Sequence, residues 1–266
     1  MKLILSRKGF DSSNGGCPSP IMPDGALLSM PIPSNDDKDK YSDLQYKGLK
    51  YSDLLKQINP KKEYSFCHID PDIRDNNRVK EISGWKAAFG QYGSAQGKLA
   101  NSAVEKGDIF LYFGWFRKVE QINGSYKFID RKKGDFYDHA DLHVIYGYMQ
   151  IGEIYKLPEA ASSFEWHPHA HYSGGPNVIY TPSDTLSLNP KLKGYGTLDF
   201  RKDRVLTLEG ANRGTWIKYP FLMPENVCER RKNSASGEGL YYSGIWQELV
   251  IKESKGLFDW VRRVIE

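Results

Sequence analysis

The chain has 266 residues, of which 39% are hydrophobic and 13% aromatic, so it can build a substantial core and is not disordered as a whole. Its formal net charge of +4 at pH 7 is mild, compatible with a nucleic-acid partner but shared by many enzymes. No apolar run approaches the roughly 20 residues of a membrane-spanning helix, and the apolar residues after Lys2 are too few for a secretory signal, so we expect a cytoplasmic protein.

The first predicted element is a short buried strand at Leu3–Leu5, followed by a long loop over residues 9–35. The glycines and prolines of this loop exclude a helix, because proline lacks a backbone donor and glycine permits positive φ. A long loop inside a compact domain is uncommon and usually functional.

The start of this loop has the composition of a phosphate-binding segment. Arg7 offers a planar fork of donors and Lys8 a point charge, Ser6 and Ser12 add hydroxyls, and Gly15-Gly16 lets backbone N–H groups approach an anion. The chain has neither GxxxxGK[ST] nor GxGxxG, so it lacks the markers of Walker-type and Rossmann nucleotide sites. The alternative is a proline-rich loop whose charges are simply solvated.

Next along the chain, residues 51–58 (YSDLLKQI) predict a helix capped by Ser52 or Asp53. A short strand is predicted at residues 66–69, leading into the sequence His-Ile-Asp-Pro-Asp.

His68 and Asp70 are the most suggestive pair of polar residues in this part of the chain. In an extended segment they share one face, and a carboxylate beside an imidazole suits a general base or a metal ligand with its supporting partner. The alternative is an Asp-Pro turn in which Asp70 caps its own backbone.

The strongest strand signals lie in the middle of the chain. Residues 107–116 (GDIFLYFGWF) and 142–157 predict two long strands, with Gly147 and Gly152 as β-bulges in the second. Asn123-Gly124 between them predicts a type I′ hairpin turn.

Further short strands are predicted at residues 177–182, 203–208 and 249–252, and a terminal helix at 258–265. The three cysteines are odd in number and widely spaced, so no disulfide framework is expected. We therefore expect one α+β domain over residues 1–266 with mostly antiparallel strands.

A run of alternating histidines stands in a loop near residue 170. In an extended segment His167, His169 and His171 point the same way, and neutral imidazoles are good ligands for Zn, Fe or Ni. Pro168 bends the segment, so the alternative is that His167 and His169 hydrogen-bond backbone or phosphate. A divalent metal is the one cofactor that this pattern suggests.

Several stretches together resemble the bacterial and phage family called nucleotide modification associated domain 3. They are SRKGFDSSNGGCPSPIMPDG at 6–25, HIDPD at 68–72, FGQYGSAQGKL at 89–99, GDIFLYFGWFR at 107–117, HVIYGYMQIGEI at 143–154, HPHA at 167–170 and WQEL at 246–249. The resemblance implies a role in a DNA-modification or phage-defence system, since the family was named for gene neighbourhoods concerned with modified bases. It implies an association and not a reaction.

A second similarity is local. Gly107-Asp108 opening a strand, and Ile-Gly-Glu-Ile at 151–154 ending another, look like the central hairpin of PUA-like barrels such as the EVE, YTH and ASCH domains. This similarity implies a PUA-like mixed, mostly antiparallel β-barrel with an N-terminal polar loop and peripheral helices. Such domains hold a flipped or modified base in an aromatic pocket.

The expected function is recognition or processing of a modified nucleotide or base, free or in DNA. Trp85 or Trp115 would stack the base, although most aromatic residues of this chain are expected in the core. The remaining candidate residues would contact the base edge or act on it: Asp11, His68, Asp70, Gln91, Gln247 and Glu248.

Three classes of protein stay open at this point. The first is a binding module, the second is a nucleotide-directed hydrolase or group transferase with a His/Asp pair or a metal, and the third is a scaffold subunit. The expected partners are a nucleotide or DNA and other proteins of a modification system, and no membrane.

Overall fold

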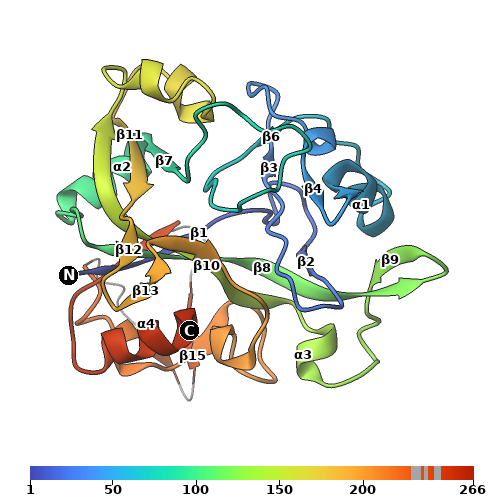
Figure 1. The fold of residues 1–266 in the computed structure, drawn as a ribbon. Coiled ribbons are helices and arrows are strands. Elements are labelled where there is room, and N and C mark those ends of the chain that lie inside the picture. The colour runs from blue at the N-terminus through green and yellow to red at the C-terminus, as the bar shows by residue number, and fades with distance from the viewer. Residues whose placement is uncertain (229–234, 237–238, 243–246) are drawn as a thin grey trace.

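The computed structural model describes residues 1–228, 235–236, 239–242 and 247–266. The fold is mixed α/β, made mostly of strands with few helices, around a sheet that curls along its long strands (Figure 1). Among the residues that the structure describes, no helix is long and apolar enough to cross a membrane.

The main sheet has nine strands, with the order β18-β1-β8-β10-β11-β7 along its path. Three further strands branch from it, because β14 pairs with β10 while β2 and β9 pair with β8. The pairings of β1 and β2 with β8 are parallel and the others antiparallel. Their bounds are β1 Leu3–Arg7, β2 Ser19–Ile21, β7 Phe89–Tyr92, β8 Ile109–Ile122, β9 Ser125–Phe128, β10 Leu142–Lys156, β11 Asn177–Pro182, β14 Tyr195–Thr197 and β18 Glu248–Ile251.

Smaller elements surround this sheet. The small sheets are β3 Ile32–Pro33 with β6 Cys67–His68, β4 Gln45–Tyr46 with β5 Leu49–Lys50, β12 Thr185–Leu186 with β13 Asn189–Lys193, and β15 Thr215–Ile217 with β17 Gly239–Tyr241 and β16 Ala235–Ser236. The α-helices are α1 Tyr51–Ile58, α2 Gly93–Asn101, α3 Phe136–His139 and α4 Leu257–Ile265. Short 3₁₀ helices are η1 Tyr41–Asp43, η2 Ala161–Ser163, η3 Pro168–His171, η4 Lys202–Arg204 and η5 Pro220–Leu222.

The central strands separate two hydrophobic cores. Successive side chains of a strand point to opposite faces, so in β1 Leu3 and Leu5 join one core and Ile4 the other. In β8, Phe113 lies in the first core and Tyr112 in the second. In Figure 1, β3, β6 and β7 lie above these strands, and α3, α4 and β15 lie below. The two faces of the sheet therefore carry different structures.

Several predicted elements are confirmed. The helix at residues 51–58 and the strand at 177–182 have the predicted bounds. The pairing registers shift at Gly147 and between Ile151 and Glu153, so both predicted bulges are present.

Three local predictions are wrong. The helix at Tyr51 follows Lys50, with no side-chain cap from Ser52 or Asp53. Residues 203–208 form part of η4 and two isolated bridges rather than a strand. The loop at 9–35 contains β2, where Ser19 pairs with Phe116, because the short segment is buried against the long strand β8.

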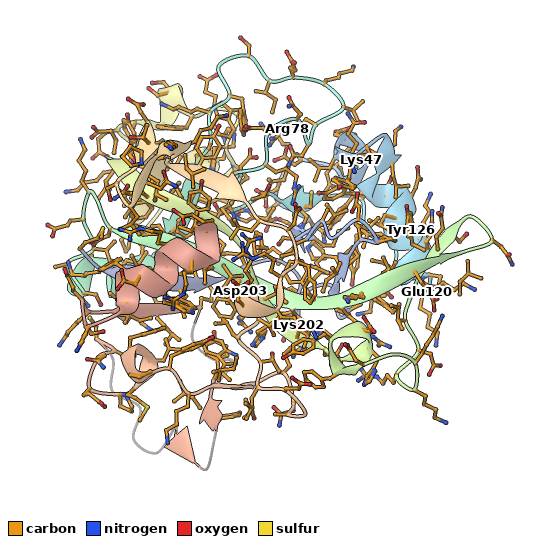
Figure 2. All side chains as sticks on the ribbon, turned by 60° about the horizontal axis from the view of Figure 1, so that its bottom comes forward. Lys47, Arg78, Glu120, Tyr126, Lys202 and Asp203 are labelled. Atoms are coloured by element: carbon orange, nitrogen blue, oxygen red, sulfur yellow. The ribbon has the colours of Figure 1, made fainter. Side chains whose placement is uncertain are left out.

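The β8–β9 hairpin turns at the predicted Asn123-Gly124 pair, with Glu120 and Tyr126 on its two arms (Figure 2). Gly124 has φ +80°, and a methyl group added there would meet no other atom within 4 Å. Gly124→Ala therefore adds backbone strain alone, and we expect a loss of about 1 kcal/mol in the free energy of unfolding, measured by urea denaturation. An unchanged midpoint would contradict this turn geometry.

Candidate functional site

A cluster of histidines and carboxylates lies where β6, β7 and η3 meet. His68 belongs to β6, and its Nδ1 lies 3.0 Å from Asp37 Oδ2 and 3.1 Å from the Tyr172 hydroxyl. The Tyr172 ring stacks on the His68 imidazole at a centroid distance of 5.8 Å. Because a carboxylate can only accept, His68 Nδ1 carries the proton and its Nε2 keeps a lone pair.

Asp70 follows His68 by two residues and is held by the neighbouring strand. Its Oδ1 accepts a hydrogen bond of 2.7 Å from the Gly90 backbone N–H in β7. Only 4% of the Asp70 side chain is exposed. The backbone of β7 thus fixes a buried carboxylate in the cluster.

His169 is anchored on the far side of its ring. Asn177 uses its Nδ2 to donate to the carbonyl oxygens of His169 and Tyr172, so its Oδ1 faces His169 Nδ1 at 3.1 Å. That orientation requires the proton of His169 to lie on Nδ1, which leaves Nε2 with a lone pair.

His167 stands behind Asp70. Its Nδ1 accepts from the His169 backbone N–H at 3.2 Å, so the proton of the neutral ring lies on Nε2. His167 Nε2 lies 3.7 Å from Asp70 Oδ1, and no hydrogen-bond partner is found for it among the described residues. The Nε2–H of His167 therefore faces Asp70 at a distance beyond that of a hydrogen bond.

His169 Nε2, which carries the lone pair, lies near Asp70 but is not hydrogen-bonded to it. His169 Nε2 lies 3.7 Å from Asp70 Oδ2, beyond hydrogen-bond distance. One donor atom from each of His68, Asp70 and His169 lies within 4.8 Å of the other two. Ligands at about 2.1 Å from a tetrahedral Zn²⁺ are about 3.4 Å apart, so a small contraction would let these three residues hold a cation.

Burial sets the protonation states in this cluster. Burial lowers the pKa of His169 to about 3, with the neighbouring His68 as a further cause, so the ring is neutral at physiological pH. Burial likewise holds the pKa of His167 well below its usual range. Burial raises the pKa of Asp70 to about 6, although Lys8 and His68 oppose it. Neutral imidazole is the form that binds metals.

The carboxylate that supports His68 is ionised more easily. Burial works to raise the pKa of Asp37, but hydrogen bonds from His68 and Ser34 outweigh it and hold that pKa below its usual range. An ionised Asp37 is the partner that keeps the proton of His68 on Nδ1.

A second group of polar residues lies between the start of β18 and the end of β1. Glu248 Oε1 accepts from Gln91 Nε2 at 2.6 Å and from the Ser6 hydroxyl at 3.0 Å, and lies 3.3 Å from Lys8 Nζ. Glu248 Oε2 is buried and has no hydrogen-bond partner among the residues described. Both Lys8 and Glu248 act on the charge of Asp70, so this group adjoins the histidine cluster.

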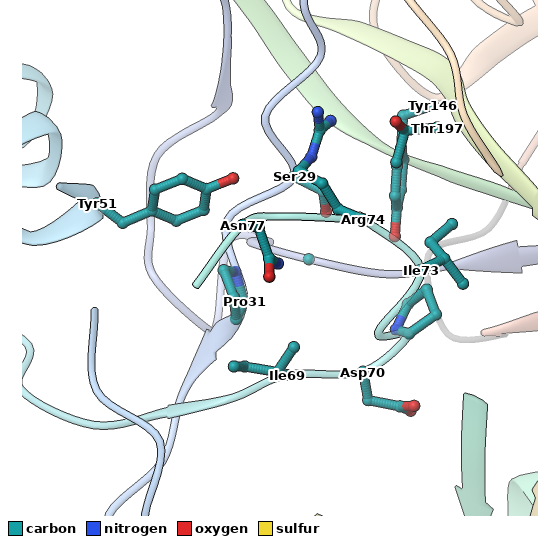
Figure 3. Close-up of a pocket in the computed structure, with 12 residues that line it drawn as sticks. Ser29, Pro31, Tyr51, Ile69, Asp70, Ile73, Arg74, Asn77, Tyr146 and Thr197 are labelled. Atoms are coloured by element: carbon teal, nitrogen blue, oxygen red, sulfur yellow. The ribbon is translucent and has the colours of Figure 1, made fainter. Parts of the chain in front are cut away.

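A small cavity of about 40 Å³ adjoins Asp70. Figure 3 shows Asp70 at one edge of it, next to Ile69. The cavity has room for water and is too small for a nucleobase.

Of the sequence candidates, Ser6, Lys8, His68, Asp70, Gln91, His167, His169 and Glu248 come together in this region. The candidate residues of the opening loop lie in two different places. Ser6 and Lys8 belong to this region, whereas Arg7 lies 3.6 Å from Asp11 and borders a different cleft together with Ser12 and Trp115.

The remaining candidates lie apart from the cluster. Asp11 Oδ1 accepts from the backbone N–H groups of Ser13 and Asn14, and the Gly16 N–H donates to the Asp11 carbonyl, so these amides are occupied within the loop. The Gly15 carbonyl accepts from Asn59 and Tyr64. The Trp85 indole donates to Asp72 at 2.8 Å, and Gln247 is exposed.

Three partners of the histidines were not predicted from the sequence. Asp37 lies in a charged stretch that resembles solvated surface, and Tyr172 and Asn177 follow the histidine loop without a recognisable motif. Asp37 and Tyr172 lie 31 and 104 residues from His68 along the chain, so their pairing depends on the approach of distant segments, whereas Asn177 lies 8 residues from His169. A search of the sequence for carboxylates and amides that could anchor histidines would have found too many to choose among.

Comparison with known proteins gives one match. A family model described as nucleotide modification associated domain 3 matches residues 2–252. Neither the curated proteins nor the solved structures contain a match.

Proposed function

The chain belongs to the nucleotide modification associated domain 3 family, whose description indicates involvement in nucleotide-modification systems. From that premise we propose that it is an enzyme that processes a nucleotide or base at a metal centre formed by His68, Asp70 and His169. The three residues come from two segments about 100 residues apart and share one small volume.

One observation carries this proposal. Both histidines have Nδ1 fixed by a second residue, His68 by Asp37 and His169 by Asn177, and each keeps the Nε2 lone pair that a metal requires. A core histidine whose role is purely structural usually has both ring nitrogens satisfied. Two imidazoles and one carboxylate suit Zn²⁺ or Fe²⁺ and leave coordination positions open for water or substrate.

The residues around the centre match this chemistry. A divalent cation would polarise a phosphate or carbonyl oxygen and lower the pKa of a bound water. Glu248 has Oε1 saturated by Ser6, Gln91 and Lys8. Its Oε2, which has no partner among the described residues, can accept a proton from water or a hydrogen bond from an N–H of the substrate. Lys8 also lies over the Phe89 ring at 4.5 Å from its centroid, which fixes the position of its positive charge.

Mass spectrometry of candidate substrates tests the proposal. Metal-loaded protein is incubated with modified and unmodified deoxynucleoside monophosphates and with short single strands that contain the same bases. We expect a mass change in at least one substrate that is lost after chelation and restored by Zn²⁺ or Fe²⁺. Binding of a modified nucleotide with no mass change would contradict the enzyme proposal and indicate a binding module. No binding at all would favour a scaffold subunit.

Asp37 gives a sharper prediction because its carboxylate does not face the cation position. Asp37→Asn removes the charge that fixes the His68 proton, so we expect metal affinity to fall by about 10- to 100-fold. The melting temperature of the metal-free protein is expected to fall as well, because the folded state lowers the pKa of Asp37 and its ionised form therefore stabilises the fold. Asp36→Asn is the matched control, because Asp36 is the exposed neighbour. Equal affinity in both variants, measured by competition with a chromogenic chelator, would show that Asp37 has no such role.

We further infer that residues 1–266 act as one cytoplasmic domain in a DNA-modification or phage-defence system, with a nucleotide or DNA as partner. The bulges at Gly147 and at Ile151/Glu153 and the curl of the main sheet support the PUA-like barrel as its fold.

A further inference from the structure

A large cleft is lined by residues of α3, β8, β10 and the loop before β15. Figure 1 shows α3 and β15 on the face of the main sheet opposite β3 and β6. The cleft has a volume of about 790 Å³. It lies outside the histidine cluster and shares no lining residue with the cavity beside Asp70.

Strand alternation brings Arg7 and Trp115 to this cleft. Arg7 follows Leu3 and Leu5 on their face of β1, whereas Lys8 points to the opposite face with Ile4 and Ser6. Trp115 likewise follows Phe113 on its face of β8. The two adjacent cations Arg7 and Lys8 therefore serve different sites.

The cleft is positively charged. Three arginines line it, Arg7, Arg131 and Arg213. Of the nearby carboxylates, Asp141 is contacted by Arg131 at 2.6 Å, and Asp11 lies 3.6 Å from Arg7. Burial lowers the pKa of Arg213, Asp141 and Asp11 oppose this effect, and repulsion from Arg7 adds to it less than Asp141 opposes it. Burial also holds the pKa of the adjacent His143 well below its usual range, with Arg213 and Arg7 as further causes. The three guanidinium groups therefore face two carboxylates, Asp141 and Asp11, which leaves one net positive charge at the cleft.

Flat aromatic surfaces border the same cleft. Arg213 stacks on Trp115, with its guanidinium carbon 4.0 Å from the ring centroid, and donates to the Ser12 hydroxyl at 3.1 Å. The Trp115 indole N–H is buried and has no hydrogen-bond partner among the described residues. Tyr241 is 58% exposed, an unusual exposure for a large aromatic side chain. The cleft thus combines guanidinium groups, stacking surfaces and an unsatisfied donor.

We propose that this cleft binds a single-stranded nucleic acid, with a phosphodiester on Arg7 and Arg213 and an unpaired base against Trp115 or Tyr241. Cationic grooves with aromatic stacking platforms are the usual means of holding single strands, and Arg matches phosphate with two parallel donors. Because the sheet separates the cleft from the histidine cluster, it is a docking site for the strand and not part of the reaction centre.

Fluorescence anisotropy with a labelled oligothymidylate tests this proposal. The titration is carried out in EDTA, so the result is independent of the metal centre and of turnover. We expect Arg213→Gln to weaken binding by about 10-fold or more at low salt and to reduce the slope of log K against log salt by about 0.7, the value for one phosphate contact to a single strand. Arg263→Gln is the matched control, because Arg263 is exposed in α4 and lies outside the cleft.

A second variant tests the proposal independently of the folding of Arg213→Gln, since Arg213 is half-buried. Tyr241→Ala removes an exposed ring, and we expect it to weaken binding about 5-fold or more through lost stacking, with an unchanged melting temperature. Equal affinity for single-stranded RNA supports the proposal, because the phosphodiester and the unpaired bases are shared.

Three results would overturn it. They are identical affinity and salt slope in wild type and Arg213→Gln, tighter binding of a duplex than of a single strand, and equally tight, Arg213-dependent binding of a poly-glutamate peptide.

Discussion

Asp70→Asn is expected to lower turnover of the nucleotide substrate by about 100-fold or more. Asparagine keeps the shape of the side chain and can still accept from the Gly90 N–H, but it lacks the negative charge that the cation requires. Binding of the nucleotide itself is expected to persist. Steady-state kinetics with the substrate identified by mass spectrometry measures the effect, with a fall in kcat and little change in KM.

The same substitution is also expected to change the stability of the metal-free protein. Burial raises the pKa of Asp70 from 3.8 to about 6. Its ionisation therefore costs stability as the pH rises from about 4 to above 6 in the metal-free protein. Removing the charge should make metal-free Asp70→Asn about 2 to 3 kcal/mol more stable than wild type at pH 7. The control is Asp75→Asn, since Asp75 is exposed. Wild-type turnover in Asp70→Asn would contradict the assignment of the site.

Gly90→Ala is expected to displace His169 and abolish metal binding. A Cβ at residue 90 would lie 2.3 Å from two atoms of the His169 ring, a contact that neither group can accommodate without movement. We expect a loss of about 1 to 3 kcal/mol in the free energy of unfolding, as for other overpacked sites. The metal content of the purified protein should fall with it, because the ring can no longer meet Asp70.

Gly97→Ala is the matched control for this substitution. Gly97 lies inside α2, and an added methyl group meets no atom within 4 Å. Alanine is the better helix former, so this variant should gain up to about 1 kcal/mol. Full metal content in Gly90→Ala would mean that His169 does not hold the metal in the position described.

The alternation of apolar residues along the strands and the residue types at the turns made much of the fold predictable. The central strands alternate between two faces with a period of two residues, and Asn123-Gly124 supplies positive φ at both turn positions, 49° and 80°. These signals are local, so they are readable without the fold. The strand expected at residues 203–208 is absent because Val205 and Thr207 form isolated bridges, one with β10 and one with β15, and not a continuous ladder.

The candidate site was predictable in part for the same reason. His68 and Asp70 share a face of an extended segment, and that rule identified them. The same rule, applied to β1, separates Arg7 from Lys8, although the composition of the opening loop predicts that both bind phosphate. Asp37 could not be predicted, because its contact with His68 is set by packing between segments 31 residues apart. Asn177 lies only 8 residues from His169 but follows it without a recognisable motif.

The most direct test of the metal centre is the metal content of the protein, purified without an affinity tag and measured by inductively coupled plasma mass spectrometry. Because three protein ligands with anchored partners bind Zn²⁺ or Fe²⁺ tightly, about one equivalent per chain is expected in wild type and after reconstitution. The double variant Asp70→Ala/His169→Ala should hold almost none. Wild-type protein that stays free of metal after incubation with Zn²⁺ or Fe²⁺, or a double variant that retains the full equivalent, would contradict the account.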